Sequence, residues 1–326
     1  MENVIQNNLK FMLEVMMYLR KGEKFLIIAN DRARSRCISE TIMDLAISMG
    51  VETVMATMTV RKNFGDEPPK AIATAMKEVD VVLEVSENFD ITHTDARMQA
   101  SAMGKRVYLM WTDMAEDYLR NPISLKDLEE IEERDKAVAK AMDDAERLQI
   151  TSPYGTDLTC SIKGRTARRL WARMPMAALP DYGEVPVIPL EGTTNGVVVT
   201  DAGVQGWGYA LKKPIRVEVK KGRALIETVS SEVKEEAERF KSTLMLDENA
   251  NNCAAEVAIG TSHLVPRVLT GAVRDYAILG YVHIAFGRNL DLGGQTSSAV
   301  HQDVLLTEAS IKLDDHYILK DGILKV

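Results

Sequence analysis

Two histidines and two acidic residues stand close together in the last quarter of the chain, which has only five histidines in 326 residues. They are Glu256, His283, His301 and Asp303. Imidazole and carboxylate groups hold Zn, Mn or Fe(II) in enzymes, and two histidines with one carboxylate leave coordination positions open for substrate or water. These residue types predict a metal site.

The spacing of the residues has two interpretations. His301 and Asp303 are two residues apart, so on a regular strand both side chains point to one face and can share an ion. A strand that merely exposes a histidine and an aspartate has the same spacing. His283 lies in the nearly apolar segment 281–286, where a buried imidazole needs a polar partner. A hydrogen bond inside the core or a metal ion meets that need.

Length and charge limit the classes of function. A chain of 326 residues with 46% hydrophobic residues buries a substantial core and is expected to form two domains. The net charge of -8 and the isoelectric point near 5.3 argue against a nucleic-acid-binding surface, because phosphate binding needs clustered Lys and Arg. One basic cluster is interpreted as a solvated face, or as a receptor for an acidic substrate or partner subunit: Arg165, Arg168, Arg169 and Arg173.

The first apolar stretch, residues 11–19, does not have the pattern of a membrane-spanning helix. It is short, it contains Glu14, and it runs directly into two basic residues. No small-residue cleavage site follows it, so we expect an amphipathic first helix. Three widely spaced cysteines indicate neither a disulfide framework nor a thiolate metal site. We therefore expect a cytoplasmic protein that binds a small molecule and no membrane.

Two kinds of pattern divide the chain. Residues 1–123 alternate strand-like runs such as 25–29, 51–58 and 79–85 with helical periodicity such as 36–49, which predicts an α/β domain with a parallel sheet. Residues 124–149 contain no Gly or Pro and predict one long bridging helix. Residues 150–326 are punctuated by glycine and rich in strand-like runs, which predicts an α+β domain that carries the metal site.

A further carboxylate stands alone in the second half. Glu184 lies in the segment 179–186, whose Pro and Gly residues predict an exposed turn. Without a precedent, an isolated glutamate of this kind is a solvated side chain.

Several motifs resemble the aminopeptidase T family of metallopeptidases. They are YGTDLTCSIKGR at 154–165, GEVPVIP at 183–189, AEVAIGTS at 255–262, HIAFGRN at 283–289, GG at 293–294 and HQD at 301–303, and THTDAR at 92–97 is similar to the same family. The same superfamily includes the 2,5-dihydroxypyridine dioxygenases, which use mononuclear Fe(II) to open a pyridine ring. The resemblance covers most of the chain.

The resemblance implies a ligand set. Glu184 and Glu256 match two metal-binding glutamates, His283 matches a histidine ligand, and His301 and Asp303 match the closing pair. In the peptidases these groups hold two divalent ions.

Two other positions bear on the activity. His93 matches a position that delivers an acid or base to the site across a domain or subunit boundary. Leu290 stands where the peptidases have a tyrosine, and the chain is also closer in length to the ring-cleaving relatives.

The leading hypothesis is a divalent-metal-dependent hydrolase that acts at a carbonyl of a small substrate. It opens a cyclic ketone- or amide-like ring, or it cleaves peptides as an aminopeptidase does. A Mn, Zn or Fe(II) ion would lower the pKa of water and polarise the carbonyl, while Glu184, Glu256 or His93 moves the proton.

Two alternatives belong to other classes. One is a ring-cleaving dioxygenase with Fe(II) on His283, His301 and Asp303. The other is a non-catalytic protein that a metal ion stabilises. The resemblance and the prevalence of closed two-fold assemblies also predict a homodimer.

Overall fold

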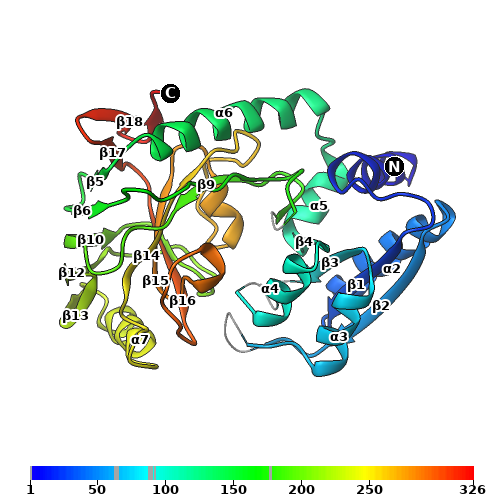
Figure 1. Ribbon diagram of the computed structural model, residues 1–326, viewed down its shortest axis with the longest axis horizontal. Helices are drawn as coiled ribbons and strands as arrows, with labels where there is room; N and C mark the ends of the chain where they lie inside the picture. Colours follow the sequence, from blue (N-terminus) through cyan, green and yellow to red (C-terminus); the bar gives the residue numbers. More distant parts are fainter. Residues whose placement is uncertain (1, 62–65, 87–90, 92, 176–177) are drawn as a thin grey trace. The chain divides into compact units, whose positions relative to one another are not determined.

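The structure is a computed structural model that describes residues 2–61, 66–86, 91, 93–175 and 178–326 (Figure 1). The chain forms two compact units. The first contains Met1–Glu130 and Leu170–Tyr182, and the second contains Ile131–Arg169 and Gly183–Val326.

The first unit is built on a parallel sheet with the strand order β2-β1-β3-β4-β8. Its strands are β1 (Lys24–Asn30), β2 (Glu52–Met58), β3 (Val81–Ser86), β4 (Arg106–Trp111) and β8 (Ala178–Leu179). Every residue of β3 is buried, as is typical of a strand covered by helices on both faces. The expected parallel α/β arrangement is confirmed.

Helices alternate with these strands along the chain. They are α1 (Glu2–Phe11) with the π-helical turn η1 (Met12–Met16), α2 (Ala33–Ser48), α3 (Lys70–Glu78), α4 (Asp95–Ala102) and α5 (Thr112–Arg120). The apolar stretch at 11–19 is thus largely part of the first helical segment. In the part of the chain that the structure describes, no helix is long and apolar enough to cross a membrane.

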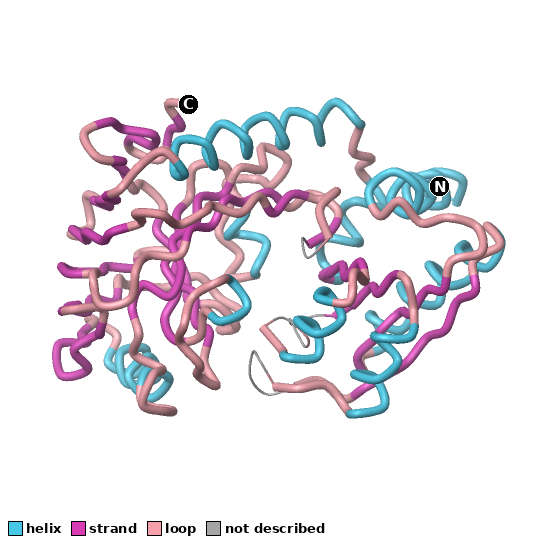
Figure 2. Tube along the Cα trace, in the orientation of Figure 1, coloured by secondary structure: helices cyan, strands magenta, loops and turns pink. Residues whose placement is uncertain are grey.

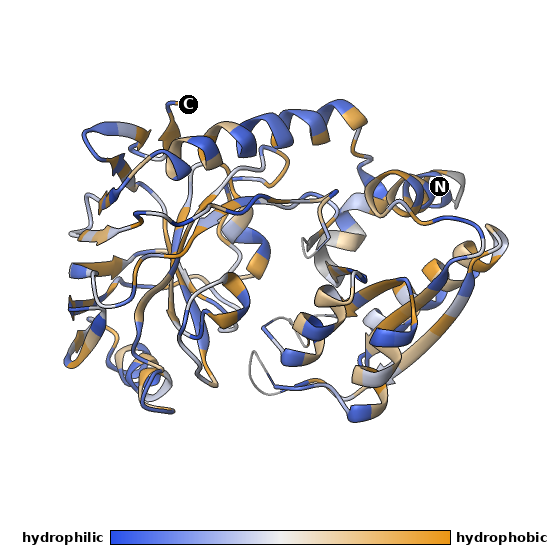
Figure 3. Ribbon diagram, in the orientation of Figure 1, coloured by the Kyte–Doolittle hydropathy of each residue, from blue (hydrophilic) through white to orange (hydrophobic). Residues whose placement is uncertain are grey.

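The expected helix over 124–149 is shorter in the structure. Helix α6 (Leu125–Asp143) ends before β5 (Arg147–Thr151), which pairs with β6 (Asp157–Ser161) and β17 (Ser310–Leu313). In β5 the side chains of Leu148 and Ile150 are buried and alternate with more exposed neighbours. This two-residue period and the strand pairing outweigh the helix propensity of the segment. Polar and apolar residues also alternate along α6 (Figure 3).

The expected division at 150 is corrected by a segment that returns to the first unit. Residues Leu170–Tyr182 belong to that unit, because β8 pairs with β4 and Tyr182 packs edge-on against Trp111 with ring centroids 5.3 Å apart. The boundary between the units also falls inside α6, after Glu130. Regular alternation in the sequence does not signal such a return of the chain.

The second unit contains two mostly antiparallel sheets (Figure 2). One has the order β13-β12-β10-β6-β5-β17-β18-β19, and its further strands are β10 (Asn195–Thr200), β12 (Ile215–Lys220), β13 (Arg223–Ser230), β18 (His316–Lys320) and β19 (Ile323–Leu324). The other has six strands in the order β11 (Gly203–Val204), β16 (His301–Leu306), β15 (Val282–Gly287), β14 (Cys253–Gly260), β9 (Gly183–Val187) and β7 (Leu170–Trp171).

Both sheets contribute to one apolar core. Leu148 and Val217 come from the first sheet, and Val257, Ile284 and Val304 come from the second. Helix α7 (Lys234–Leu244) adds Phe240, whose ring meets that of Phe286 edge-on. Because one face of the second sheet is fixed in this core, its alternate residues must face the other way.

Candidate metal centre

Four neighbouring strands carry the five expected ligands on one face of the second sheet. Glu256 of β14 and Asp303 of β16 both lie opposite Ala285 of β15. In the same registers Ala258 lies opposite His283, Gly287 opposite His301, and Gly260 opposite Glu184 of β9. Residues directly opposite each other share a face, and alternate residues of one strand do so as well. The common face that the spacing of His301 and Asp303 predicted therefore extends across four strands.

The residues between the ligands on this face are small. Ala258, Gly260, Ala285 and Gly287 leave the ligand side chains room above the sheet. A Cβ on Gly260 would collide with the carbonyl oxygen of Ile278. The glycines of the motifs therefore allow the close backbone approach that encloses the site.

The carboxylate of Glu256 lies between the two histidines. His283 Nε2 lies 3.5 Å from Glu256 Oε1 and 3.6 Å from Glu184 Oε2. His301 Nε2 lies 3.4 Å from Glu256 Oε2 and 3.2 Å from Asp303 Oδ1. The ligand atoms of Glu184, Glu256 and His283 all lie within 4.8 Å of one another. Each oxygen of Glu256 thus faces a different histidine.

Burial makes the charge of this group important. Three acidic side chains and two imidazoles are each at most 8% exposed. Burial lowers the pKa of His283, but its hydrogen bond with Glu256 and the charges of Glu184 and Asp303 outweigh this effect and raise the pKa to about 9. Burial likewise opposes the rise in the pKa of His301, which Asp303 and Glu256 hold well above its usual value. The site therefore favours positive charge.

The donor set fits a divalent cation. Acidic side chains outnumber imidazoles by one, so even doubly protonated histidines leave the carboxylates in excess. A divalent ion would replace the two histidine protons and balance two of the three carboxylate charges. Mixed carboxylate and imidazole ligands suit Mn, Zn and Fe(II).

Residues outside the expected set orient the histidines. His301 Nδ1 lies 2.7 Å from the carbonyl oxygen of Arg288, so Nδ1–H donates and Nε2 is the nitrogen that faces the site. The ring of Tyr276 meets His283 edge-on at 5.2 Å, and its hydroxyl donates to the carbonyl oxygen of Asp303 at 3.3 Å. Neither contact could be predicted from the sequence. A backbone carbonyl group has no sequence signal, and Tyr276 is not part of any motif with the ligand residues.

The expectation of an exposed Glu184 is wrong. Glu184 lies on β9 and is 6% exposed. Val185 and Val187 of the same strand point into the core, so Glu184 points to the ligand face. Pairing of β9 with β14 accounts for the difference, because proline and glycine near a strand end resemble a turn.

A buried acid of helix α6 supports the strand ends beside Glu184. The hydroxyl of Thr261 donates to Asp135 at 2.5 Å, and its N–H donates to the carbonyl oxygen of Gly183 at 2.9 Å. Burial raises the pKa of Asp135 to about 8; the charge of Glu184 adds to the rise, and the bond from Thr261 opposes it. Asp135 is therefore largely protonated at neutral pH.

His93 belongs to the first unit. It is buried and precedes helix α4, where the hydroxyl of Thr94 accepts the N–H of Arg97 and caps the helix. Its φ of 62° is the left-handed backbone conformation. Residue 92 of the same motif lies outside the described residues. The expected role of His93 in proton transfer stays a prediction.

Comparison with known proteins gives the family. Residues 13–264 match the model of the family described as NicX, 2,5-dihydroxypyridine 5,6-dioxygenase. The chain belongs to this family. The matched range includes Glu184 and Glu256 and ends before His283. No curated protein sequence matches the chain.

Solved structures share the fold of this family member. The 2,5-dihydroxypyridine dioxygenase of Pseudomonas putida KT2440 aligns with a TM-score of 0.80 and 16% identity over 98% of this chain and 96% of that one. Wild-type AmpT of Thermus thermophilus aligns with a TM-score of 0.71 and 17% identity over 100% of both chains. Both resemblances inferred from the motifs are thus confirmed. The family and the buried ligand group together support a metal-dependent enzyme rather than a non-catalytic binding protein.

Proposed function

We propose that this family member is a divalent-metal-dependent hydrolase that attacks a carbonyl carbon of a small substrate, either an amide- or ketone-like ring or a short peptide. The sharing of Glu256 between His283 and His301 supports this function. A carboxylate with one oxygen toward each of two ligand groups suits a pair of ions, and paired ions are common in hydrolytic sites.

The five side chains divide into two ligand groups. Glu184, His283 and one oxygen of Glu256 would hold one ion, while His301, Asp303 and the other oxygen of Glu256 would hold the second. When bound, such ions polarise a carbonyl group and lower the pKa of water. The deep burial of these side chains limits competition from bulk water.

Proton transfer is assigned to Glu184 for a site that holds a single ion, because its carboxylate is then not needed as a ligand. Glu184 Oε2 lies 3.6 Å from His283 Nε2, beside the remaining ligands. The hydrogen bonds of Thr261 with Asp135 and with the carbonyl oxygen of Gly183 hold the strand end that carries Glu184. We expect Glu184→Gln to keep the melting temperature but to lower kcat by about 10²- to 10⁴-fold. If Glu184→Gln keeps a near-wild-type kcat, Glu184 is not the proton-transfer residue, and Glu256 or His93 is proposed for that role instead.

A second candidate is an Fe(II)-dependent ring-cleaving dioxygenase. The description of the family and the 0.80 TM-score with the Pseudomonas putida enzyme favour it. His283, His301 and Asp303 would supply two imidazoles and one carboxylate, a set that leaves positions for a hydroxylated ring and O2. In this candidate a single ion suffices.

Oxygen dependence separates the two functions. The protein would be purified without O2, loaded with Mn(II) or Fe(II), and assayed on 2,5-dihydroxypyridine, a cyclic imide and leucine p-nitroanilide. A hydrolase turns over equally with and without O2 and incorporates oxygen from isotopically heavy water. Consumption of one O2 for each ring opened, with both atoms in the product, would contradict hydrolysis and support the dioxygenase.

The proposed assembly is a homodimer in the cytoplasm. Closed two-fold symmetry is the commonest assembly of soluble enzymes. Sedimentation at micromolar concentration would measure the state directly, and a fully active monomer would contradict the dimer.

A further inference from the structure

A pocket of about 330 Å³ lies in the second unit beside the turn that follows β15. Two arginines, Arg165 and Arg168, line it together with the apolar side chains of Ile188 and Leu292. The sequence interpretation of this basic cluster as a solvated face does not hold for Arg165, whose side chain is 17% exposed. The pocket therefore combines sheltered positive charge with apolar walls.

Arg168 keeps most of its hydrogen-bonding capacity. Its Nη1 donates to the carbonyl oxygen of Asp291 at 2.9 Å. Within the described part of the chain no carboxylate pairs with its guanidinium, which has five N–H donors in a planar fork. A carbonyl group carries no net charge, so the positive charge of Arg168 is not neutralised.

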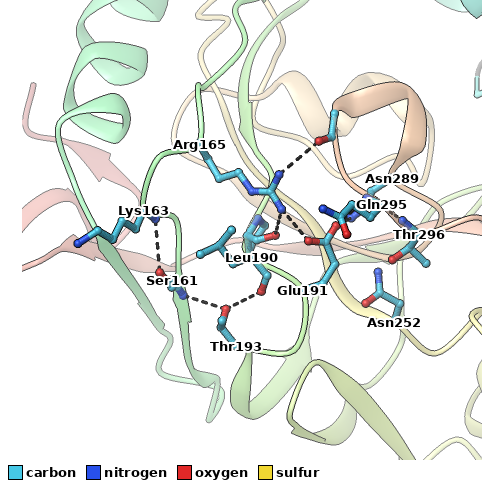
Figure 4. A network of polar contacts seen from close by, with 12 residues as sticks. Ser161, Lys163, Arg165, Leu190, Glu191, Thr193, Asn252, Asn289, Gln295 and Thr296 are labelled. Carbon is cyan, nitrogen blue, oxygen red and sulfur yellow. Dashed lines mark hydrogen bonds and ion pairs between the residues drawn. The ribbon is translucent and has the colours of Figure 1, made fainter.

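Arg165 is the second arginine that lines the pocket, and Figure 4 shows its polar partners. Its Nη2 lies 2.6 Å from Glu191 Oε2, and its Nη1 donates to the carbonyl oxygen of Gly293 at 3.3 Å. Its Nε is buried and has no hydrogen-bond partner among the described residues. A buried donor without an acceptor is costly, and a bound oxygen atom would remove that cost.

Glu191 cannot neutralise both arginines. Its Oε1 accepts the N–H of Gln295 at 2.8 Å and the side-chain amide of Asn289 at 3.2 Å, while Oε2 accepts Arg165 (Figure 4). Both oxygens are therefore engaged, and the two guanidiniums exceed this carboxylate by one charge. Arg168 remains the unpaired cation of the pocket walls.

We propose that this pocket binds the carboxylate group of a small organic molecule. Arg168 receives the carboxylate, because a planar guanidinium matches the two oxygens of a carboxylate. Ile188 and Leu292 contact the carbon skeleton, which an inorganic oxyanion lacks. Binding needs neither a metal ion nor turnover, so it stands apart from the proposed hydrolysis.

The pocket is connected to the candidate metal centre by one turn. Asp291, whose carbonyl oxygen accepts Arg168, also pairs through its carboxylate with Arg288 Nε at 3.3 Å. The carbonyl oxygen of Arg288 in turn orients His301. A carboxylate held by Arg168 therefore lies next to the turn that fixes a ligand histidine.

Binding of radiolabelled benzoate in equilibrium dialysis tests the proposal. Benzamide, its neutral isostere, and sulfate, an oxyanion without a carbon skeleton, are the competitors. We expect one benzoate per chain, with benzamide and sulfate each at least about tenfold weaker as competitors. Benzamide is neutral, and a charge-assisted hydrogen bond is stronger than a neutral one. Sulfate is charged but lacks the ring that would contact Ile188 and Leu292.

Three variants locate the bound benzoate. Arg168→Gln removes the charge, and Thr166→Asp places a tethered carboxylate on an exposed residue that lines the pocket. Both should weaken benzoate binding at least about tenfold. The matched control Arg147→Gln removes an exposed arginine that pairs with Asp315, and it should bind as the wild type does.

Thr166→Asp keeps the test valid even if Arg168→Gln does not fold, because Thr166 is exposed. Absence of benzoate binding by the wild type would overturn the proposal. So would benzoate binding that Thr166→Asp leaves unchanged, or competition by sulfate equal to that by benzoate.

Discussion

The two sheets of the second unit each carry a charged pair at the same two-residue spacing. On β12, Arg216 and Glu218 lie 2.9 Å apart, and their side chains are 43% and 44% exposed. On β16, His301 and Asp303 lie 3.2 Å apart, and their side chains are 2% and 8% exposed. The two pairs have the same spacing in the sequence, but the pair on β12 is exposed and the pair on β16 is buried. Burial, and not spacing, therefore distinguishes the candidate metal site from a solvated strand surface.

The two strands differ in the burial of the residues that face away from the core. In β12 the residues that face away from the core are partly or fully exposed, whereas all six residues of β16 are buried. An exposed ion pair contributes roughly 0–1 kcal/mol to stability. Buried ionisable groups persist only with strong partners, which at β16 are Glu256 and, in our proposal, the metal ions.

The largest expected effect belongs to Glu256→Gln. Both ligand groups lose a carboxylate oxygen together, so we expect loss of bound metal and a fall in kcat/KM of at least about 10³-fold. Elemental analysis and steady-state kinetics measure the two quantities, and circular dichroism checks the fold. Full metal occupancy in this variant would contradict the shared role of Glu256.

Asp303→Asn should have the next largest effect. It removes one carboxylate from the group of His301, so we expect one fewer bound ion and a loss of most activity. Glu218→Gln is the matched control, because it changes an acidic residue at the same spacing from a basic one. Equal activities of the two variants would contradict the assignment of Asp303, and not Glu218, to the metal site.

Some features of the candidate site and of the fold can be predicted from the sequence. The spacing of His301 and Asp303 predicts a shared face, and the apolar segment around His283 predicts burial, and the structure has both features. The parallel sheet of the first unit is equally readable, because its strands are continuous apolar runs. Such local patterns need no knowledge of distant contacts.

Other features depended on contacts between distant segments. The sequence predicts an exposed turn at Glu184, because nothing in the local sequence indicates that β9 pairs with β14. The buried Asp135 has ordinary helical neighbours, and only the packing of α6 against Thr261 reveals its place beside the site. Return of residues 170–182 to the first unit likewise depends on the pairing of β8 with β4.

The stability of the metal-free protein should fall in alkaline solution. The pKa of His283 is raised from 6.5 to about 9 in the folded chain, so its stabilising effect is complete below pH 6.5 and is lost as the pH rises to 9. The raised pKa of Asp135 changes stability in the same direction. Urea unfolding between pH 6.5 and 9 measures this fall.

The metal-loaded protein is the control for this pH dependence. Bound ions replace the protons of His283 and His301, so we expect a smaller fall over the same pH range. A metal-free protein whose stability is constant from pH 6.5 to 9 would show that the carboxylates do not hold protons on these histidines.

The smallest effect is expected on the solvated sheet. Arg216→Ala should change the free energy of unfolding by less than about 1 kcal/mol, because its ion pair is exposed. Chemical denaturation measures the change, and high salt should reduce it further. A loss of several kcal/mol would mean that burial does not separate the two pairs.

Electron paramagnetic resonance of the protein loaded with Mn(II) tests the central claim most directly. If Glu256 bridges two ligand groups, the wild-type protein binds two ions per chain and gives the spectrum of an exchange-coupled pair. Asp303→Asn should then give the spectrum of an isolated ion. A wild-type protein that saturates at one ion per chain, with the spectrum of isolated Mn(II), would contradict the paired site.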